Sequence, residues 1–367
     1  MPVPSMDRVI EFRSTIPGIA WPLLSADRHA AVVALQHQFE QIEFFDRSIQ
    51  VKHQLHQMAR VVNHAAQWVP FYVDRLKPYP GVSPHSFGLE QLEKLPIMQA
   101  GDIRTSFAQM VSRKPPRDHG SVEKVYTRSL PGGPSYLVRP GVNSLLENAI
   151  KLRDNLWQCR DLSARHLSIR HLPKSVSEKF DDDGWLPGCE TGPALVLNTA
   201  LSVDRLYSRL IEFDPVYLEA PLATIEELLA FCRTARHKPR ALKEVRSLSS
   251  ISNIEELSGG AHSYLRNLNI EHSVSYSLHG LVTLTLPCPE GYGHHLQVET
   301  AYCELLDDED APCGEHISGR LVVTTLQNFL MPLIRLDLGT RATPMGACRC
   351  GRTLPLIRVE HNKAVCQ

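Results

Sequence analysis

The stretch that decides the fold is residues 299–355, which read ETAYCELLDDEDAPCGEHISGRLVVTTLQNFLMPLIRLDLGTRATPMGACRCGRTLP. Three segments, LQVETAYCELL (296–306, which begins just before this stretch), GRLVVTTL and MPLIRLDLG, have a β-rich composition and are separated by acidic, glycine and proline turns. Short apolar segments punctuated in this way predict strands joined by tight turns. With VTLTL just upstream, they predict a small barrel or distorted sheet in the last hundred residues.

The middle of the chain alternates short apolar strands with amphipathic helices. We expect strands at HLSIRHL (166–172), ALVLNT (194–199) and VRSLSSIS (245–252), and helices at SVDRLYSRLIEF (202–213) and TIEELLAFCRTA (224–235). This alternation predicts βαβ units and a sheet with parallel strands, so the fold class is α/β.

The N-terminal part predicts a long helix over residues 26–66. Its apolar side chains recur at steps of three and four residues, as one face of a helix requires. The residues that set this period are Ala31, Leu35, Phe39, Ile42, Phe45 and Ile49.

The motifs GEHISGRLVVT, NFLMPLIR and CRCGR follow one another in residues 314–352. In this order they resemble the phenylacetate–CoA ligase-like (CapK-type) branch of the adenylate-forming (acyl-CoA synthetase) superfamily. HAAQWVPFYVDRL, LEKLPIMQAGDIRTSF and DPVYLEAPLATIEELLAFC look like earlier parts of the same family. The resemblance spans roughly residues 55–360 and covers the large N-terminal domain only.

The resemblance implies two doubly wound α/β subdomains plus a small β-barrel-like subdomain. We expect a helical region and part of the first subdomain in residues 1–120, α/β subdomains with an altered phosphate loop in 121–280, and a β-rich subdomain in 281–360. The family's mobile C-terminal domain, which carries a catalytic lysine, is expected to be absent from this sequence.

The implied reaction is the activation of an aromatic or other organic acid. The carboxylate attacks the α-phosphate of ATP, which gives an acyl-adenylate and pyrophosphate, and the thiol of CoA then displaces AMP. Magnesium would help to neutralise the phosphates. The partners implied are a small acid or acyl thioester, with ATP, Mg²⁺ and CoA.

The family's phosphate loop reads Thr-Ser-Gly-Ser-Thr-Gly-x-Pro, and residues 127–134 here read TRSLPGGP. Backbone amides and hydroxyls of such a loop hold phosphates, whereas Pro131 removes one amide donor. The resemblance makes five residues of this loop candidate nucleotide ligands: Thr127, Arg128, Ser129, Gly132 and Gly133.

Two further family segments have changed. YSLHG at 276–280 falls where the family has Tyr-Gly-x-Thr-Glu, so His279 replaces a metal-binding glutamate and Tyr276 is a candidate to stack on adenine. RLDLGT at 335–340 falls where the family ends in a ribose-binding aspartate, so Thr340 stands at that position, with Asp337 nearby. A neutral hydroxyl makes weaker hydrogen bonds to ribose than a carboxylate.

Two sites outside the nucleotide region are also expected. Gly259 and Gly260 resemble the family's Gly-Gly turn beside the acyl pocket, although a plain turn fits them equally. Cys288, His295, Cys348 and Cys350 make a Cys₃His set, since some members of this branch pair an upstream Cys and His with the later Cys-x-Cys. Such a set suits structural Zn²⁺, with His294 as an alternative ligand.

Composition excludes several classes of protein. The chain has 39 Lys and Arg against 40 Asp and Glu, a net charge of −1, which gives no field for nucleic acid or an anionic membrane. No signal-peptide pattern or apolar run of about 20 residues is present. Nine cysteines, an odd number, favour thiols or metal ligands in a reducing cytoplasm. No Gly-x-Ser-x-Gly hydrolase motif is found, and a homodimer stays open.

The altered nucleotide motifs leave three functions open. The first is ATP-dependent acid activation, with a separate chain supplying the missing domain. The second is a non-adenylating homologue, a pseudoenzyme that binds an acyl ligand or partner protein. The third is an ATP-independent acyl transferase. The departures together predict that this chain alone does not carry out the two-step ligation.

Overall fold

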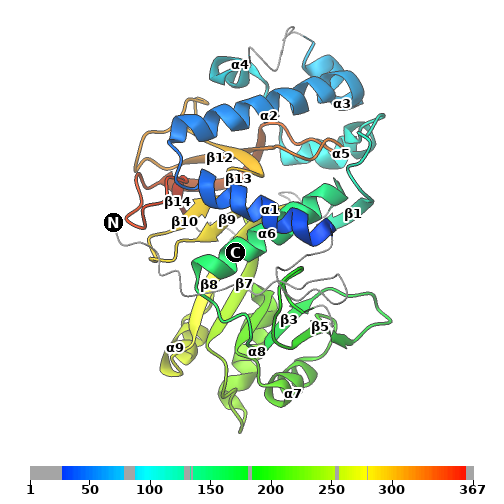
Figure 1. The fold of residues 1–367 in the computed structure, drawn as a ribbon. Helices are drawn as coiled ribbons and strands as arrows, with labels where there is room; N and C mark the ends of the chain where they lie inside the picture. Colours follow the sequence, from blue (N-terminus) through cyan, green and yellow to red (C-terminus); the bar gives the residue numbers. More distant parts are fainter. Residues whose placement is uncertain are drawn as a thin grey trace. The chain divides into compact units, whose positions relative to one another are not determined.

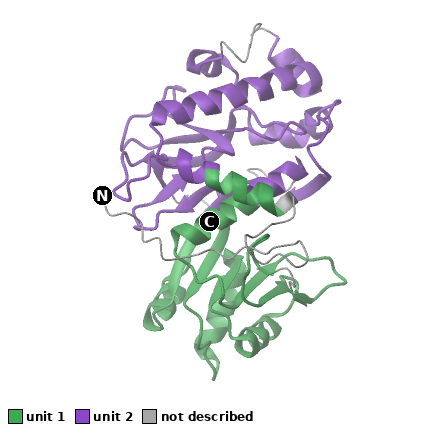
Figure 2. Cartoon of the chain, viewed as in Figure 1, with its two compact units in different colours: residues 1–37, 148–248, 256–274 green, residues 38–147, 249–255, 275–367 purple. Residues whose placement is uncertain are grey.

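The chain folds into two compact units, which are described separately (Figure 2). Unit 1 comprises residues 1–37, 148–248 and 256–274, and unit 2 comprises residues 38–147, 249–255 and 275–367. The structure, a computed structural model, describes residues 27–77, 87–127, 133, 135–180, 184–252, 256–278 and 280–360. The predicted α/β class is confirmed.

Unit 1 is built on a mainly parallel sheet (Figure 1). Its order is β7-β6-β3-β5-β4, in which only β4 runs antiparallel to its neighbour. The predicted strands at 166–172, 194–199 and 245–252 fall on β3, β5 and β7. The bounds are β3 (His166–Arg170), β4 (Glu178–Phe180), β5 (Ala194–Asn198), β6 (Tyr217–Pro221) and β7 (Glu244–Ser250).

Three helices pack with one face of this sheet. They are α7 (Val203–Phe213), α8 (Leu222–Thr234) and α9 (Gly259–Asn267). Leu167 and Ile169 of β3 join the apolar cluster that these helices complete. Because successive side chains of a strand point to opposite faces, His166, Ser168 and Arg170 lie on the other face of the sheet.

The predicted helix over residues 26–66 is in fact two helices, α1 (Asp27–Ile42) and α2 (Arg47–Trp68). The interruption has a tertiary cause. The backbone N–H of Thr353 donates to the carbonyl of Glu43 at 2.8 Å, and its hydroxyl donates to the carbonyl of Phe45. These carbonyls bond to a distant segment instead of continuing the helix. Phe45 and Ile49, which the helical pattern placed in the core, are exposed.

The other helices of unit 2 are short, apart from α6. They are α3 (Pro70–Arg75), α4 (Leu89–Lys94), α5 (Ala100–Met110) and α6 (Gly141–Trp157), whose last residues belong to unit 1. Pro70 opens α3, a position where its missing N–H is not needed. A hairpin of β1 (Val122–Thr127) and β2 (Ser135–Pro140) flanks the predicted phosphate loop.

The strands of the last hundred residues that the structure describes pair antiparallel, most of them in unit 2, while a separate β-rich subdomain over 281–360 stays a prediction. The strand order is β11-β12-β13-β14-β10-β9-β8. Their bounds are β8 (Glu271–Leu278, divided between the units at 274/275), β9 (Val282–Pro287), β10 (His294–Leu296), β11 (Ala301–Leu306), β12 (Gly319–Thr325), β13 (Leu336–Pro344) and β14 (Leu356–Val359).

Helix α2 is fixed to this sheet by buried amides. Gln54 donates from Nε2 to the carbonyls of Val298 and Ala301 at 2.8 and 2.9 Å. Its amide therefore gives a hydrogen-bond partner to one carbonyl of the turn before β11 and to one at the start of β11. None of the helices in the described part of the chain is long and apolar enough to cross a bilayer.

Candidate metal centre and associated sites

The four side chains of the predicted Cys₃His set come together in unit 2. The ligand atoms of Cys288, His295, Cys348 and Cys350 all lie within 4.8 Å of one another. The sulfurs of Cys288 and Cys348 are 3.6 Å apart, and Cys350 Sγ is 3.3 Å from His295 Nε2. Two sulfurs on one tetrahedral zinc, each about 2.3 Å from the metal, would be about 3.8 Å apart. The cluster therefore has dimensions that suit a zinc-sized cation.

Two neighbouring features of the sheet position these ligands. Cys288 follows β9 and His295 lies in β10, so one hairpin supplies both. Gly293 in its turn has φ +144°, and a Cβ there would stand 2.8 Å from the carbonyl of Ile357. Only glycine lets this turn approach β14 so closely. Cys348 and Cys350 lie in the turn that precedes β14.

His295 is oriented by a second hydrogen bond. Its Nδ1 lies 3.0 Å from the carbonyl of Leu354, and the ring is fully buried. A carbonyl only accepts, so Nδ1 carries the proton and Nε2 faces Cys350 with its lone pair, as metal-bound histidines require. His294 lies on the opposite strand face, with its ring 4.9 Å from that of Tyr276, so His295 is the histidine in the cluster.

The thiol of Cys348 is costly to ionise without a cation. Burial raises the pKa of Cys348 to about 12, and the side chains of Cys350 and Cys288 add to that rise, whereas the backbone of Cys350 opposes it. A bound divalent cation reverses this preference, because a coordinating thiol loses its proton outright. The donor set and its surroundings thus fit a metal ion.

The predicted ribose-binding residues make internal hydrogen bonds instead. The hydroxyl of Thr340 donates to the carbonyl of Ile251 at 2.7 Å, and the residue is 1% exposed. Asp337 accepts from Arg320 Nη1 at 2.6 Å and from the Gly339 amide at 2.8 Å. Both residues therefore stabilise strand β13 and its contacts within unit 2.

The structure covers only part of the predicted phosphate and adenine site. Arg128, Ser129, Gly132 and His279 lie outside the described residues. Of the described residues, Thr127 ends β1 opposite Ser135, Gly133 has φ +120°, and Tyr276 is buried in β8. Their role in nucleotide binding stays a prediction.

The predicted acyl-pocket glycines lie at the start of α9 in unit 1. Ser258 caps this helix by accepting from the amide of Ala261. A Cβ at Gly260 would stand 2.4 Å from Arg233 Nη1, whereas Gly259 has open space around it. A side chain at Gly260 would therefore require the Arg233 guanidinium to shift, and an acyl-binding role for the pair stays a prediction.

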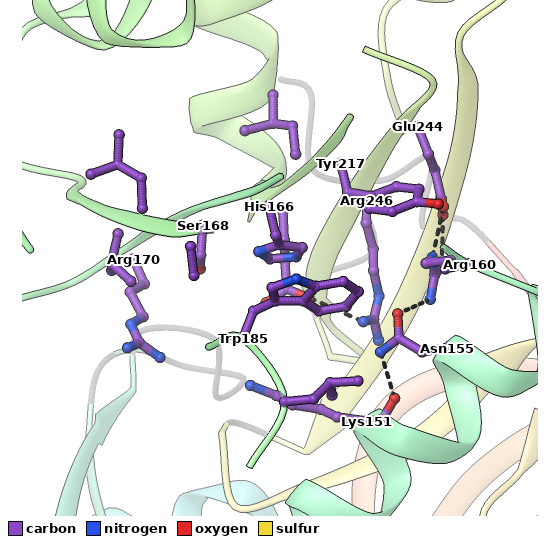
Figure 3. Close-up of a pocket in the computed structure, with 16 residues that line it drawn as sticks. Lys151, Asn155, Arg160, His166, Ser168, Arg170, Trp185, Tyr217, Glu244 and Arg246 are labelled. Atoms are coloured by element: carbon purple, nitrogen blue, oxygen red, sulfur yellow. Dashed lines mark hydrogen bonds and ion pairs between the residues drawn. The ribbon is translucent and has the colours of Figure 1, made fainter. Parts of the chain in front are cut away.

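Unit 1 also contains a pocket that the sequence pattern did not single out (Figure 3). It is partly open and holds about 620 Å³ of empty space, open solvent included, over the polar face of the sheet. The signal was present in HLSIR, where polar residues alternate with Leu167 and Ile169, but alternation alone does not show what covers a strand. Its polar lining consists of Lys151, Asn155, Arg160, His166, Ser168, Arg170, Trp185, Tyr217, Glu219, Glu244 and Arg246.

A network of buried charges forms one wall of this pocket. Arg160 donates to both carboxylate oxygens of Glu244 at 2.7 Å and to Asp154 at 2.6 Å. Arg246 pairs with Asp154 and with Glu219, each at 3.0 Å. Burial alone would raise the pKa of Glu219, but the charges of Arg246 and Lys151 outweigh it and hold that pKa at about 2.

An aromatic pair forms another wall. The rings of His166 and Trp185 stack with centroids 4.8 Å apart and planes 14° apart, as Figure 3 shows. Burial lowers the pKa of His166 to about 4, although the carboxylate of Glu219 opposes this shift. The imidazole is therefore neutral at physiological pH, and it stacks on the indole as an uncharged aromatic ring.

Replacing His166 by glutamine is expected to flatten the dependence of stability on pH. The unfolded chain protonates this histidine near pH 6.5 and the folded chain only near pH 4, so the native ring loses stability as the pH falls through that window. We expect the wild type to lose about 1–2 kcal/mol more than His166→Gln between pH 7 and pH 5. Urea unfolding of both proteins at pH 7 and at pH 5 measures this difference in the free energy of unfolding. The exposed His237→Gln is the control, and equal losses in all three proteins would contradict the expectation.

Comparison with known proteins identifies the fold. No protein-family model matches the chain, and no match is found among the curated proteins. An open conformation of 2-hydroxyisobutyryl-CoA ligase in complex with 2-HIB-AMP and CoA matches with a TM-score of 0.68 and 16% identity, over 87% of this chain and 76% of that chain. The same ligase in the postadenylation state with R3-HIB-AMP matches with a TM-score of 0.66 and 17% identity, over 86% and 68%.

The chain has the fold of these acyl-CoA ligases. The structure of 2-hydroxyisobutyryl-CoA ligase in the thioesterification state also matches, with a TM-score of 0.65 over 87% of this chain and 70% of that chain. The predicted adenylate-forming fold is therefore confirmed. At 16–17% identity the likeness concerns the fold alone, and the phenylacetate–CoA ligase-like branch stays a prediction.

Proposed function

We propose that this chain uses an acyl-CoA ligase fold to bind a small organic acid or its acyl thioester, without carrying out ATP-dependent ligation by itself. The observation that carries the proposal is that Thr340 is buried and hydrogen-bonded inside the protein. Where the resembling family has a ribose-binding aspartate, this chain has a hydroxyl that is 1% exposed and donates to Ile251. Asp337, the nearest acid in that segment, is held by Arg320.

The physical consequence is a lower binding affinity for the nucleoside. A carboxylate accepts hydrogen bonds from both ribose hydroxyls, and such charge-assisted bonds are the strong ones. Bonds to charged groups contribute about 1.5–3 kcal/mol each. Losing them lowers affinity by one order of magnitude or more, and the altered phosphate loop at 127–134 and His279 act in the same direction.

Calorimetric titration of the full chain with ATP and Mg²⁺, and with AMP, is the test. We expect no saturable heat up to about 1 mM nucleotide, which corresponds to a binding free energy weaker than about −4 kcal/mol. Parallel titrations use benzoate, phenylacetate and 2-hydroxyisobutyrate with their CoA thioesters, and we expect at least one to bind. Micromolar binding of ATP with Mg²⁺ would overturn the proposal.

The second candidate is ATP-dependent activation of an aromatic or other organic acid. The fold match over 87% of the chain favours it. The acid would attack the α-phosphate and release pyrophosphate, and CoA would then displace AMP, with the catalytic lysine supplied by a separate chain. Acid-dependent exchange of labelled pyrophosphate into ATP reports the first step directly. Exchange above the background without acid would establish this candidate in place of the first.

We propose further that the Cys₃His cluster binds one structural Zn²⁺. Three thiolates and one imidazole fill a tetrahedron, so no position is left for water or substrate, and the metal acts in folding rather than in chemistry. It would join the β9–β10 hairpin to the turn before β14. Reduced thiolates of this kind suit the reducing cytoplasm, where we place the protein.

A further inference from the structure

The parallel sheet of unit 1 has one face of an unusual character. Strands of parallel sheets are generally apolar on both faces, because both are buried. Here β3, β6 and β7 send only one set of side chains into the apolar cluster. The alternate set is polar or charged and lines the pocket of Figure 3. Burying charged groups at this density costs free energy unless they are paired and hydrogen-bonded.

The acids of the pocket are already paired. Glu244 and Asp154 are held by Arg160, and Glu219 is held by Arg246. All three carboxylates therefore have an arginine partner in hydrogen-bond contact. A cation entering the pocket would have to compete with these arginines, which makes a cation a poor ligand for this site.

Several donors of the pocket, by contrast, have no acceptor. Among the residues that the structure describes, the side chains of Lys151, Ser168 and Arg170 make no hydrogen bond or ion pair. Ser168 is 9% exposed, so its hydroxyl faces the pocket and not open solvent. The indole N–H of Trp185 is buried and lacks a partner as well. Lys151 is half-buried and Arg170 is exposed, so the buried donor without an acceptor is the Trp185 N–H, and such donors are rare in proteins and call for an explanation.

These donors converge from two elements. Ser168 and Arg170 are two residues apart on β3, so they point to the same face and lie roughly 7 Å apart along the strand. Lys151 comes from α6, and Figure 3 shows its side chain reaching toward the side of the pocket where Arg170 lies. A hydroxyl flanked by an ammonium and a guanidinium is the donor set that proteins use for carboxylate and phosphate oxygens.

We propose that this pocket is a binding site for the oxyanion group, phosphate or carboxylate, of a small molecule, held by Lys151, Ser168 and Arg170 with Trp185 as its wall. The site goes beyond the proposed function, since none of these residues is among the candidate nucleotide, acyl or metal ligands. Such a ligand supplies an acceptor for the buried N–H of Trp185, which has none within the protein. Trp185 offers its N–H to a further oxygen of the same ligand.

The test is calorimetric titration of the full chain with inorganic phosphate, and separately with acetate and benzoate. We expect saturable binding of at least one of them with a dissociation constant below about 1 mM. Lys151→Met and Arg170→Met should each weaken it roughly tenfold or more, and Ser168→Ala by a smaller factor. Phosphate and carboxylate titrations distinguish the two sources of the oxyanion. The acidic residues 181–183 lie outside the described residues, and the full chain includes their effect.

Arg205→Met is the matched control, because Arg205 is an exposed cation of α7 in the same unit and does not line the pocket. It should bind the anion as the wild type does. Far-ultraviolet circular dichroism and melting points show that each variant is folded. Binding that survives in the Lys151→Met/Arg170→Met double variant would overturn the proposal. So would the absence of saturable binding by phosphate, acetate and benzoate alike. Neither result depends on whether ATP binds.

Discussion

Replacing Arg160 by methionine is expected to lower the free energy of unfolding by about 3–5 kcal/mol. Arg160 is 7% exposed, and its guanidinium holds Glu244 through two hydrogen bonds and Asp154 through a third. Asp154 is fully buried. Methionine fills a similar volume but leaves these carboxylates without their main partner in a region of low dielectric. An uncompensated buried charge, and not the lost attraction, is the source of the large effect.

Urea unfolding of the variant beside the wild type measures this loss. Arg165→Met serves as the control, because Arg165 pairs with Asp214 at the surface and should cost less than about 1 kcal/mol. Adding Glu244→Gln to Arg160→Met removes one stranded charge and should restore part of the stability, which a double-mutant cycle quantifies. A loss below about 1 kcal/mol in Arg160→Met would show that the network does not depend on this residue.

Removing the proposed zinc is expected to produce the second large effect. Elemental analysis of the purified chain should find about one zinc per chain, and Cys348→Ser should retain much less. We expect the variant, or the chelator-treated wild type, to lose several kcal/mol, because metal-binding free energy is folding free energy at a structural site. For a chain of this size that corresponds to a fall in melting temperature of roughly 5 °C or more.

Cys159→Ser is the matched control for this experiment, since Cys159 is an exposed cysteine outside the cluster. It should keep the zinc content and the melting temperature of the wild type. Far less than one zinc per wild-type chain would contradict the proposal. An unchanged melting temperature in Cys348→Ser would leave the metal without a structural role.

The sequence predicted the α/β class and several of the strands, β3, β5 and β7 among them, because short apolar segments between turn residues are typical of strands. It also predicted that Cys288, His295, Cys348 and Cys350 belong together, and the structure places their ligand atoms within 4.8 Å. That prediction depended on family motifs, since a Cys-x-Cys pair by itself does not reveal its distant partners. Whether the ion is zinc stays a proposal.

What the sequence could not predict depends on tertiary contacts. The end of α1 is fixed by hydrogen bonds from Thr353 to carbonyls more than 300 residues away in the chain. The internal bond of Thr340 to Ile251 joins residues 89 apart. The polar pocket of unit 1 was missed for the same reason. The pattern of β3 shows that two faces differ, but it does not show that the polar face of a parallel sheet encloses a cavity.

The spacing of the metal ligands has a consequence for how the chain assembles. Cys348 follows Cys288 by 60 residues, and β10 lies between β9 and β14 in the sheet. During synthesis Cys288 and His295 are made before the turn that contains Cys348 and Cys350. A metal ion would therefore first find only two ligands and would bind weakly. Closing a loop of this length is entropically unfavourable until β14 pairs with β10. Binding of the proposed zinc would thus be a late step, after β14 has paired with β10, and a shortage of zinc would affect newly made molecules more than mature ones.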